Sequence, residues 1–432
     1  MAKQEVTFFW FRRDLRLDDN VGLFQALQSQ YPVIPVFIFD ETILERLPND
    51  DARVGFIHES LASINQKLQE VGSSLLVKKG KPIEVWTSLL HEYSIKQVFW
   101  NKDYEPSAIH RDAVVAELLT SNGVQTFSFK DQVIFEEAEI VKADGLPYTV
   151  YTPFKNKWLE KYKSMAPLPE FDLVPLFSNF LKSEFDFLAL EEIGFVPSSI
   201  KVKPHNLKLV ANYHETRDFP AMDSTSYLSP HLRFGTVSIR KLVNWAAKKN
   251  AVFLSELIWR EFFMQILFHF PKVQNRNFKS AYDGIEWRNN EDDFKRWCEG
   301  KTGYPMVDAG MRQLNETGYM HNRVRMVVAS FLCKHLLIEW QWGEAYFAEK
   351  LLDYEMAANV GNWQWAAGTG CDAAPYFRVF NPDIQQKKFD EKGVYIRQWI
   401  KEFDLGYGQP MVDHAMARDR AIATYKAGIL KG

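Results

Sequence analysis

The first 130 residues alternate short apolar runs with segments of helical period, and this alternation constrains the fold more than any other feature of the chain. The apolar runs are residues 6–11, 33–39, 74–78, 96–100 and 124–129. The segments of helical period are residues 21–29, 55–71, 83–93 and 109–121. The first four runs are mostly apolar throughout, as in strands that are buried on both faces of a parallel sheet. We therefore predict an α/β domain with a doubly wound five-stranded parallel sheet over residues 1–130.

The rest of the chain has a different pattern. Residues 131–202 show weak periodicity and several prolines, which favours an interdomain linker. From residue 203 to residue 432 the pattern is helical, and residues 254–270 and 323–340 are each apolar enough for one buried helix. We predict an all-α second domain over residues 203–432.

The composition restricts the classes of function. A net charge of -3 argues against a surface that grips DNA everywhere, so nucleic-acid binding would need a local patch. Aromatic residues make up 15% of the chain, which favours a flat ligand or electron-transfer chemistry. The three cysteines lack metal or disulfide spacing, and the first residues do not resemble a secretory leader. We expect a cytoplasmic protein without a metal site, and without a membrane span because no apolar run reaches about 18 residues.

Residues 350–382 carry the densest group of unusual side chains. The stretch opens with a helical pattern of Leu351, Leu352 and Met356, and continues to two indoles, Trp363 and Trp365. Glycines that permit close approach and carboxylates lie beside these indoles, which suits a planar ligand. A core helix that ends in a Trp-rich turn is the alternative interpretation.

Three stretches of the second half resemble the FAD-binding part of the photolyase/cryptochrome family: residues 253–263, 320–340 and 350–382. The opening motif FFWFRRDLRLDDN resembles the same family, and the likeness looks closest to the class I photolyases. The resemblance implies a deoxyribodipyrimidine photolyase, a carbon–carbon lyase. Such an enzyme splits cyclobutane pyrimidine dimers in UV-damaged DNA by electron transfer from photoexcited reduced FAD.

The resemblance also implies the residues that hold FAD. A T-S-x-L-S segment with a tyrosine upstream matches the family's pyrophosphate-binding segment, although an ordinary helix N-cap would look similar. Arg325 and Asp353 match an ion pair beside the flavin, and Asn359 matches the residue opposite flavin N5, where an amide favours the anionic reduced cofactor. The expected FAD-binding residues are Tyr213, Thr225, Ser226, Leu228, Ser229, Arg325, Asp353, Glu355 and Asn359.

Five further positions match the dimer-contacting residues of the class I enzymes. They are Glu256, Trp259, Asn322, Met326 and Trp365. Indoles can stack on an extruded dimer, an amide can read its edge, and a carboxyl can bond a carbonyl. For each residue taken alone, core packing is the alternative. A single histidine, His321, precedes Asn322, which argues against the His pair of the (6-4) photolyases.

The resemblance implies two more sets of functional residues. Arg217, Arg323 and Arg378 match positions near the DNA groove of the family. Trp363, Trp340 and Trp287 match a chain of tryptophans that carries electrons between the surface and the flavin. Three independent buried indoles are the alternative.

The sequence departs from the family at two places. Asn362 replaces one of the glycines that usually precede the first Trp of the W-Q-W unit. Ser107 and Ala108 replace the Asn–Glu pair of folate-binding members, so we expect no folate antenna in the usual mode. A second antenna chromophore of another kind, or none, stays open.

We expect a monomer. Other activities also stay open: a cryptochrome-like blue-light photoreceptor, a (6-4) photolyase, or a nucleotide-binding module without chemistry.

Overall fold

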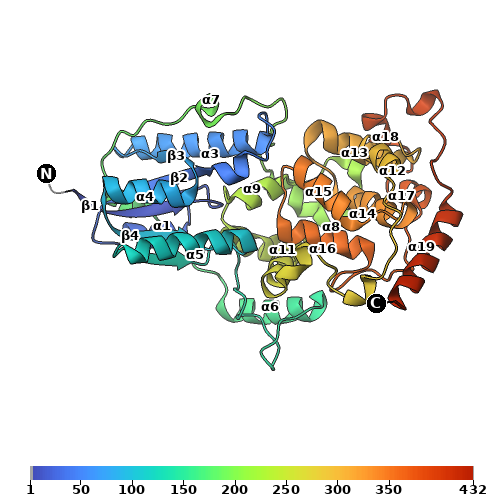
Figure 1. Cartoon of the computed structure of the whole chain (residues 1–432), viewed down its shortest axis with the longest axis horizontal. Coiled ribbons are helices and arrows are strands. Elements are labelled where there is room, and N and C mark those ends of the chain that lie inside the picture. Colours follow the sequence, from blue (N-terminus) through green and yellow to red (C-terminus); the bar gives the residue numbers. More distant parts are fainter. Residues whose placement is uncertain (1–2, 432) are drawn as a thin grey trace. The chain divides into compact units, whose positions relative to one another are not determined.

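A five-stranded parallel sheet in the order β3-β2-β1-β4-β5 organises the first part of the chain in the computed structural model, which describes residues 3–431 (Figure 1). Its strands are β1 (Glu5–Phe11), β2 (Val33–Asp40), β3 (Leu76–Gly80), β4 (Ser94–Asn101) and β5 (Gln125–Phe129). β1 pairs with both β2 and β4, so the strand order reverses at β1. The sheet and its doubly wound character confirm the prediction.

Both faces of β1 are buried, as its sequence requires. Phe9 and Phe11 belong to one hydrophobic cluster, and Phe8 and Trp10 belong to another. Because side chains alternate along a strand, the two clusters lie on opposite faces of the sheet. Residues 6–11 therefore form a nearly continuous apolar run and not an alternation of apolar and polar residues.

The chain forms two compact units. The sheet unit comprises the residues up to Glu139 together with Glu160–Pro204 and Leu228–Ala247, and the helical unit comprises Ile140–Leu159, His205–Tyr227 and the residues from Lys248 onward. The two units therefore interleave along the sequence and do not follow the linear boundaries predicted at residues 130 and 202. Part of the predicted linker belongs to the helical unit.

The helices of the sheet unit are α1 (Val21–Leu27), α2 (Glu41–Leu44), α3 (Ala52–Gln69), α4 (Pro82–Glu92), α5 (Pro106–Ser121), α7 (Leu190–Ile193) and α9 (Leu228–Phe234). Helix α10 (Ile239–Lys249) begins in the sheet unit, and its last two residues belong to the helical unit. Helix α6 (Tyr151–Met165) begins in the helical unit and ends in the sheet unit.

The other helices of the helical unit are α8 (Tyr213–Thr216), α11 (Ala251–His269), α12 (Glu291–Cys298), α13 (Pro305–Thr317), α14 (Asn322–Ser330), α15 (Trp340–Lys350), α16 (Met356–Ala367), α17 (Pro382–Phe389), α18 (Val394–Trp399) and α19 (His414–Ile429). Short 3-10 turns are η1 (Val174–Asn179), η2 (Leu207–Asn212), η3 (Pro220–Met222), η4 (Pro271–Gln274), η5 (Ser280–Tyr282) and η7 (Phe403–Leu405). None of the helices within residues 3–431 is both long enough and apolar enough to cross a bilayer.

Two helix predictions were wrong in their extent. The single helix expected over residues 323–340 ends at Ser330, continues as a π-helical turn, η6 (Phe331–His335), and stops before Leu337. Leu337 has a φ of 52°, a left-handed conformation that an α-helix cannot contain. Its carbonyl accepts a hydrogen bond of 2.8 Å from the Arg288 backbone N–H, a partner outside the local sequence.

The helix predicted to open at Leu351 is also wrong, because residues 351–355 lie between two helices. Helix α15 ends at Lys350, and Glu355 is extended, with a φ of -129°, before α16 begins at Met356. Residues 351–355 therefore form a short connection. That connection brings Asp353, Tyr354 and Glu355 to the wall of a cavity.

Candidate active site

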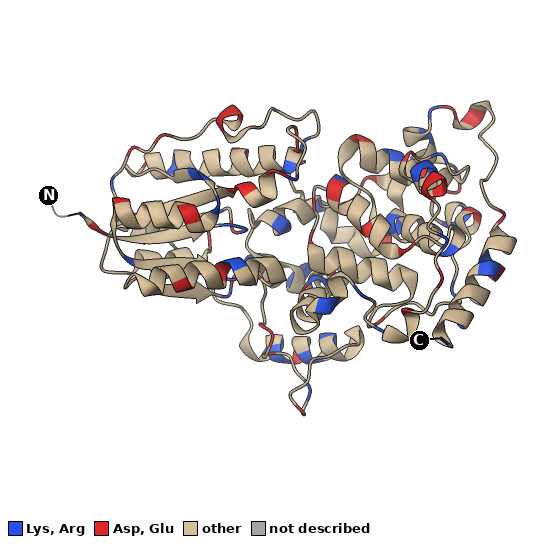
Figure 2. Cartoon of the chain, viewed as in Figure 1, with Lys and Arg blue, Asp and Glu red and all other residues tan. Residues whose placement is uncertain are grey.

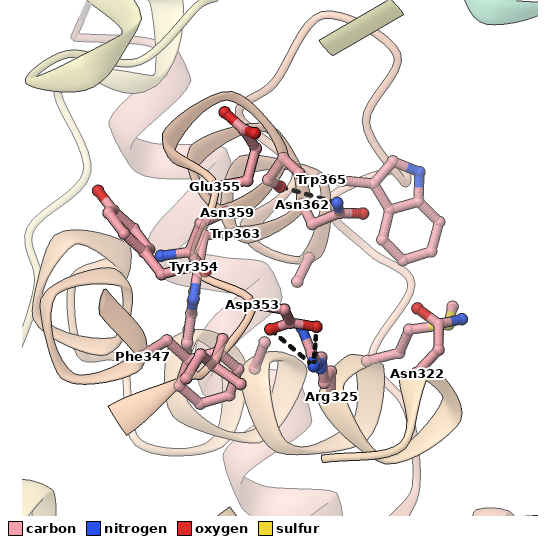
Figure 3. A pocket seen from close by; sticks show the side chains of 15 residues that line it. Asn322, Arg325, Phe347, Asp353, Tyr354, Glu355, Asn359, Asn362, Trp363 and Trp365 are labelled. Carbon is pink, nitrogen blue, oxygen red and sulfur yellow. Dashed lines mark hydrogen bonds and ion pairs between the residues drawn. The ribbon is translucent and has the colours of Figure 1, made fainter. Parts of the chain in front are cut away.

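A cavity in the helical unit contains most of the residues that the sequence singles out. The space between its walls, including the part that is open to solvent, is about 620 Å³. Its walls come from α14, α15, α16 and the connection before α16. Figure 3 shows Asn322 and Trp365 at one end, and Phe347 and Tyr354 at the other. The predicted residues that line it are Asn322, Arg325, Met326, Asp353, Glu355, Asn359, Trp363 and Trp365.

Helix α14 presents three of these residues on one face. Asn322, Arg325 and Met326 lie at positions i, i+3 and i+4, which places them side by side along the helix. The His321 side chain caps the helix by accepting a hydrogen bond of 3.2 Å at Nδ1 from the Arg323 backbone N–H. The cap therefore determines where the first cavity-lining turn begins.

Arg325 and Asp353 form the predicted ion pair. The Arg325 guanidinium donates to both carboxylate oxygens at 2.9 and 3.2 Å, and its Nε donates to the Met320 carbonyl at 2.8 Å. The Asp353 side chain is only 7% exposed, whereas that of Arg325 is 29% exposed. The pair therefore neutralises a nearly buried carboxylate and keeps a guanidinium on the cavity wall.

We predict that Arg325→Leu will weaken FAD binding at least tenfold and destabilise the protein by about 1–3 kcal/mol, because Asp353 loses a charge-assisted partner. Titration with FAD and urea denaturation of the apoprotein measure the two effects. The matched control is Arg325→Leu combined with Asp353→Leu, which should recover part of the stability without recovering FAD binding. Full FAD affinity in the single variant would contradict the assignment.

Asn359 is oriented by a residue that the sequence analysis did not identify. Its side-chain N–H groups donate to the Glu344 carbonyl at 3.1 Å and to the Glu344 carboxylate at 2.9 Å. Burial raises the pKa of Glu344, while the hydrogen bonds from Asn359 and Tyr354 act in the opposite direction. Because both N–H bonds point toward Glu344, the amide oxygen is the group that Asn359 can offer to a ligand. Glu344 lies on α15, and no local spacing links it to Asn359.

Two glycines let the helices around the cavity approach closely. A Cβ at Gly361 would lie 2.2 Å from the Phe263 ring, and a Cβ at Gly343 would lie 2.1 Å from the Trp363 indole. Asn362, which departs from the family pattern, lies within the regular helix α16, and its amide donates to the Ala358 carbonyl at 2.8 Å. The departure therefore leaves α16 helical.

We predict that stability falls as the pH drops from about 6.5 toward 4, in part because of His321. Burial lowers the pKa of His321 to about 4; the Arg325 and Arg323 guanidiniums also lower it, and Asp218 opposes them. The unfolded chain then binds more protons than the folded chain in that range, so the loss is about 1.4 kcal/mol per pH unit for this group. His321→Asn keeps a capping side chain but does not titrate, and urea denaturation across this pH range should show a shallower slope. An unchanged slope would contradict the prediction.

Two predicted dimer-contacting residues lie on α11 and do not line this cavity. The Glu256 carboxylate accepts a hydrogen bond of 2.5 Å from the Arg217 guanidinium. The Trp259 indole lies parallel to the Tyr151 ring, at 3.5 Å between centroids and 9° between planes. Arg217, expected to contact DNA, is thus the ion-pair partner of a predicted catalytic carboxylate.

The remaining FAD-binding candidates fall in different units. Tyr213 opens α8, and its ring packs edge-on against Phe253 at 5.3 Å between centroids. Thr225 and Ser226 belong to the helical unit, whereas Leu228 and Ser229 begin α9 in the sheet unit. Their joint role in holding a pyrophosphate stays a prediction.

The three tryptophans of the predicted electron path have different neighbours, and the path itself stays a prediction. Trp363 is 2% exposed and meets the Trp297 ring at 6.1 Å between centroids. Trp340 is buried and donates from Nε1 to Asn277 at 3.0 Å, and Trp287 packs edge-on against Tyr425 at 5.6 Å. The rings of Phe347 and Trp297 therefore both contact Trp363, and Trp297 is an indole that the sequence analysis did not select.

Two of the arginines expected to contact DNA also contact neighbouring side chains. Arg323 donates to Asp218 at 2.7 Å and lies over the Phe389 ring, while Arg378 lies over the Phe380 ring. Figure 2 shows both signs of charge distributed over both units. A local DNA-binding patch stays a prediction.

Comparisons with known proteins identify the family of this chain. The family model described as DNA photolyase matches residues 7–173, and the one described as the FAD-binding domain of DNA photolyase matches residues 253–405. The deoxyribodipyrimidine photo-lyase of Agrobacterium fabrum is 37% identical, and the alignment covers 97% of each chain.

Solved structures agree with this result. A class III photolyase from Agrobacterium tumefaciens has 35% identity and a TM-score of 0.88, and covers 100% of this chain and 99% of its own. An archaeal photolyase from Sulfolobus tokodaii, solved with two FAD molecules, has 33% identity and a TM-score of 0.82. The alignment covers 98% of this chain and 100% of the archaeal chain. Assignment to class I rather than another class stays a prediction. The chain belongs to the photolyase/cryptochrome family.

Proposed function

We propose that this chain is a light-driven DNA-repair enzyme that splits cyclobutane pyrimidine dimers in UV-damaged DNA. The observation that carries the proposal is the cavity of Figure 3, where residues matching flavin contacts (Arg325, Asp353 and Asn359) meet residues matching dimer contacts (Asn322 and Trp365). A photolyase needs both sets next to each other, because an electron must pass from the cofactor to the damaged base.

The residues around the cavity fit FAD. Trp363 and Phe347 supply flat apolar surface for a ring system, and the Asn359 amide oxygen can accept a hydrogen bond from a ring N–H. The Arg325 guanidinium favours an electron-rich ring nearby, and Asp353 holds that guanidinium in place. FAD, when bound, supplies the light-driven electron transfer.

The chain's own groups would bind and orient the dimer. The Asn322 amide can pair with a pyrimidine edge, and Trp365 offers an indole on which a base can stack. The Glu256 carboxyl can hydrogen-bond a pyrimidine carbonyl, and Arg217 keeps it in position. These roles follow from the chemistry of each side chain and from its match to the family.

Further features are part of the proposal. The protein acts as a monomer in the cytoplasm, and Cys298, Cys333 and Cys371 are free thiols, consistent with a reducing compartment. We expect no folate bound in the usual mode, because Ser107 and Ala108 lack the folate-binding groups, and a deazaflavin, a second flavin or no antenna stay open. The archaeal relative with two FAD molecules supports a flavin in that role.

Dimer repair under blue light tests this proposal directly. FAD-loaded protein is reduced, mixed with dimer-containing oligothymidine and irradiated with blue light, while the thymine absorbance is followed. We expect absorbance to recover in the light and not in the dark, and no recovery with an oligonucleotide that carries a (6-4) lesion. Light-driven flavin changes without dimer repair would favour a photoreceptor instead.

A further inference from the structure

Tyr151 is joined to the predicted dimer-contacting face of α11 although it lies more than a hundred residues upstream. Its ring is parallel to the Trp259 indole, at 3.5 Å between centroids and 9° between planes. Its hydroxyl donates to the Ser255 carbonyl at 2.7 Å and lies 2.6 Å from Ser255 Oγ. Ser255 and Trp259 are one turn apart on α11, so Tyr151 spans that turn with its hydroxyl at one end and its ring at the other.

Aromatic rings pack around the Trp259 indole, and part of the indole stays exposed to solvent. Trp259 also contacts Phe263 at 5.4 Å with 28° between planes, and Phe262 edge-on at 5.6 Å. Tyr151 is 5% exposed, whereas Trp259 has intermediate exposure. The buried Tyr151 ring therefore limits the tilt of an indole whose accessible part can meet a ligand.

Tyr151 is itself held from a third segment. Its backbone N–H, at the first residue of α6, donates to the Asp372 carboxylate at 3.0 Å. Burial raises the pKa of its phenol, so the hydroxyl stays a hydrogen-bond donor at working pH. The ring is thus anchored at its hydroxyl and at its backbone.

Docking of α6 does not depend on Tyr151 alone. Trp158 donates from Nε1 to the Glu261 carboxylate at 2.7 Å, and Phe154 packs on Phe262 at 5.3 Å between centroids. These contacts attach α6 to α11 in the same way. Helix α6 therefore keeps contacts with α11 when the Tyr151 ring is removed.

We propose that Tyr151 is a positioning residue for dimer recognition, which holds the Trp259 indole in the plane where a damaged base can contact it. The inference rests on the proposed function, since it assumes that Trp259 contacts the dimer. It adds a residue outside the motifs that carry the resemblance to the family. It also gives the segment Ile140–Leu159 a role in the helical unit.

The test compares binding of a fluorescent dimer-containing oligonucleotide, in the dark, to FAD-loaded variants. Tyr151→Leu should weaken binding about two- to tenfold, the range expected for loss of one aromatic pair. Tyr151→Phe, which keeps the ring, should bind within about twofold of wild type. Trp158→Phe, the matched control for α6 docking, should bind like wild type. If Tyr151→Leu does not retain FAD, Tyr151→Met replaces it.

A double-mutant cycle separates positioning from general structure. In a Trp259→Ala background, Tyr151→Leu should cause no further loss of affinity, because there is no indole left to position. An equal loss in both backgrounds, wild-type binding by Tyr151→Leu, or an equal loss in Trp158→Phe would each overturn the inference while wild-type repair stands. A wild-type chain that neither binds nor repairs dimers would overturn the proposed function and this inference together.

Discussion

Trp363→Phe should abolish light-driven reduction of oxidised FAD and leave dimer repair nearly intact when the cofactor is reduced chemically beforehand. Trp363 lines the cavity, and its side chain is 2% exposed. Phenylalanine keeps most of the packing against Phe347, which lies 5.0 Å away between centroids. It is far harder to oxidise than an indole, so the first electron donor to the flavin would be missing.

The measurement is the loss of oxidised-FAD absorbance under blue light with an external reductant, together with repair by the chemically reduced protein. Two further variants test the route beyond Trp363. Trp340→Phe should stop photoreduction if the predicted path through Trp340 and Trp287 is correct. If Trp297→Phe stops it and Trp340→Phe does not, the electron leaves through the aromatic neighbour that the structure shows. Normal photoreduction in Trp363→Phe would contradict the whole path.

Glu256→Ala should lower the repair yield of bound dimers about a hundredfold, since a single donor or acceptor aimed at developing charge contributes roughly 2.7–4 kcal/mol in such sites. Burial raises the pKa of the Glu256 carboxyl, and Arg217 opposes that effect. The carboxyl thus lies close to a partner charge and within a partly buried environment. Burial favours the neutral acid, which can donate a hydrogen bond to a pyrimidine carbonyl, whereas the Arg217 guanidinium favours the ionised form, which can only accept one.

Repair per absorbed photon at saturating dimer is the quantity to measure, with FAD content as the test of folding. Glu256→Gln is the matched control, because an amide keeps the shape and a hydrogen-bond donor, and it should retain part of the yield. A wild-type yield in Glu256→Ala would remove this residue from the mechanism. A loss of FAD would instead show that its pair with Arg217 supports the fold.

The local patterns predicted much of this protein. Continuous apolar runs of four to eight residues predicted strands buried on both faces, because a doubly covered sheet leaves no polar side on β1 or β2. The i, i+3 and i+4 spacing of Asn322, Arg325 and Met326 places them on one face of α14, because helix geometry alone determines it. These features depend on neighbours within a few residues.

Other features were decided only by the tertiary structure. The strand order around β1, the left-handed Leu337, the Glu344 partner of Asn359 and the Tyr151 ring on Trp259 each join segments that no local spacing relates. Burial and hydrogen bonding between distant segments select these contacts, and their free energies exceed the weak preferences of the local chain. The sequence by itself therefore determined the sheet and most of the helices, and packing decided where some helices end and which side chains orient one another.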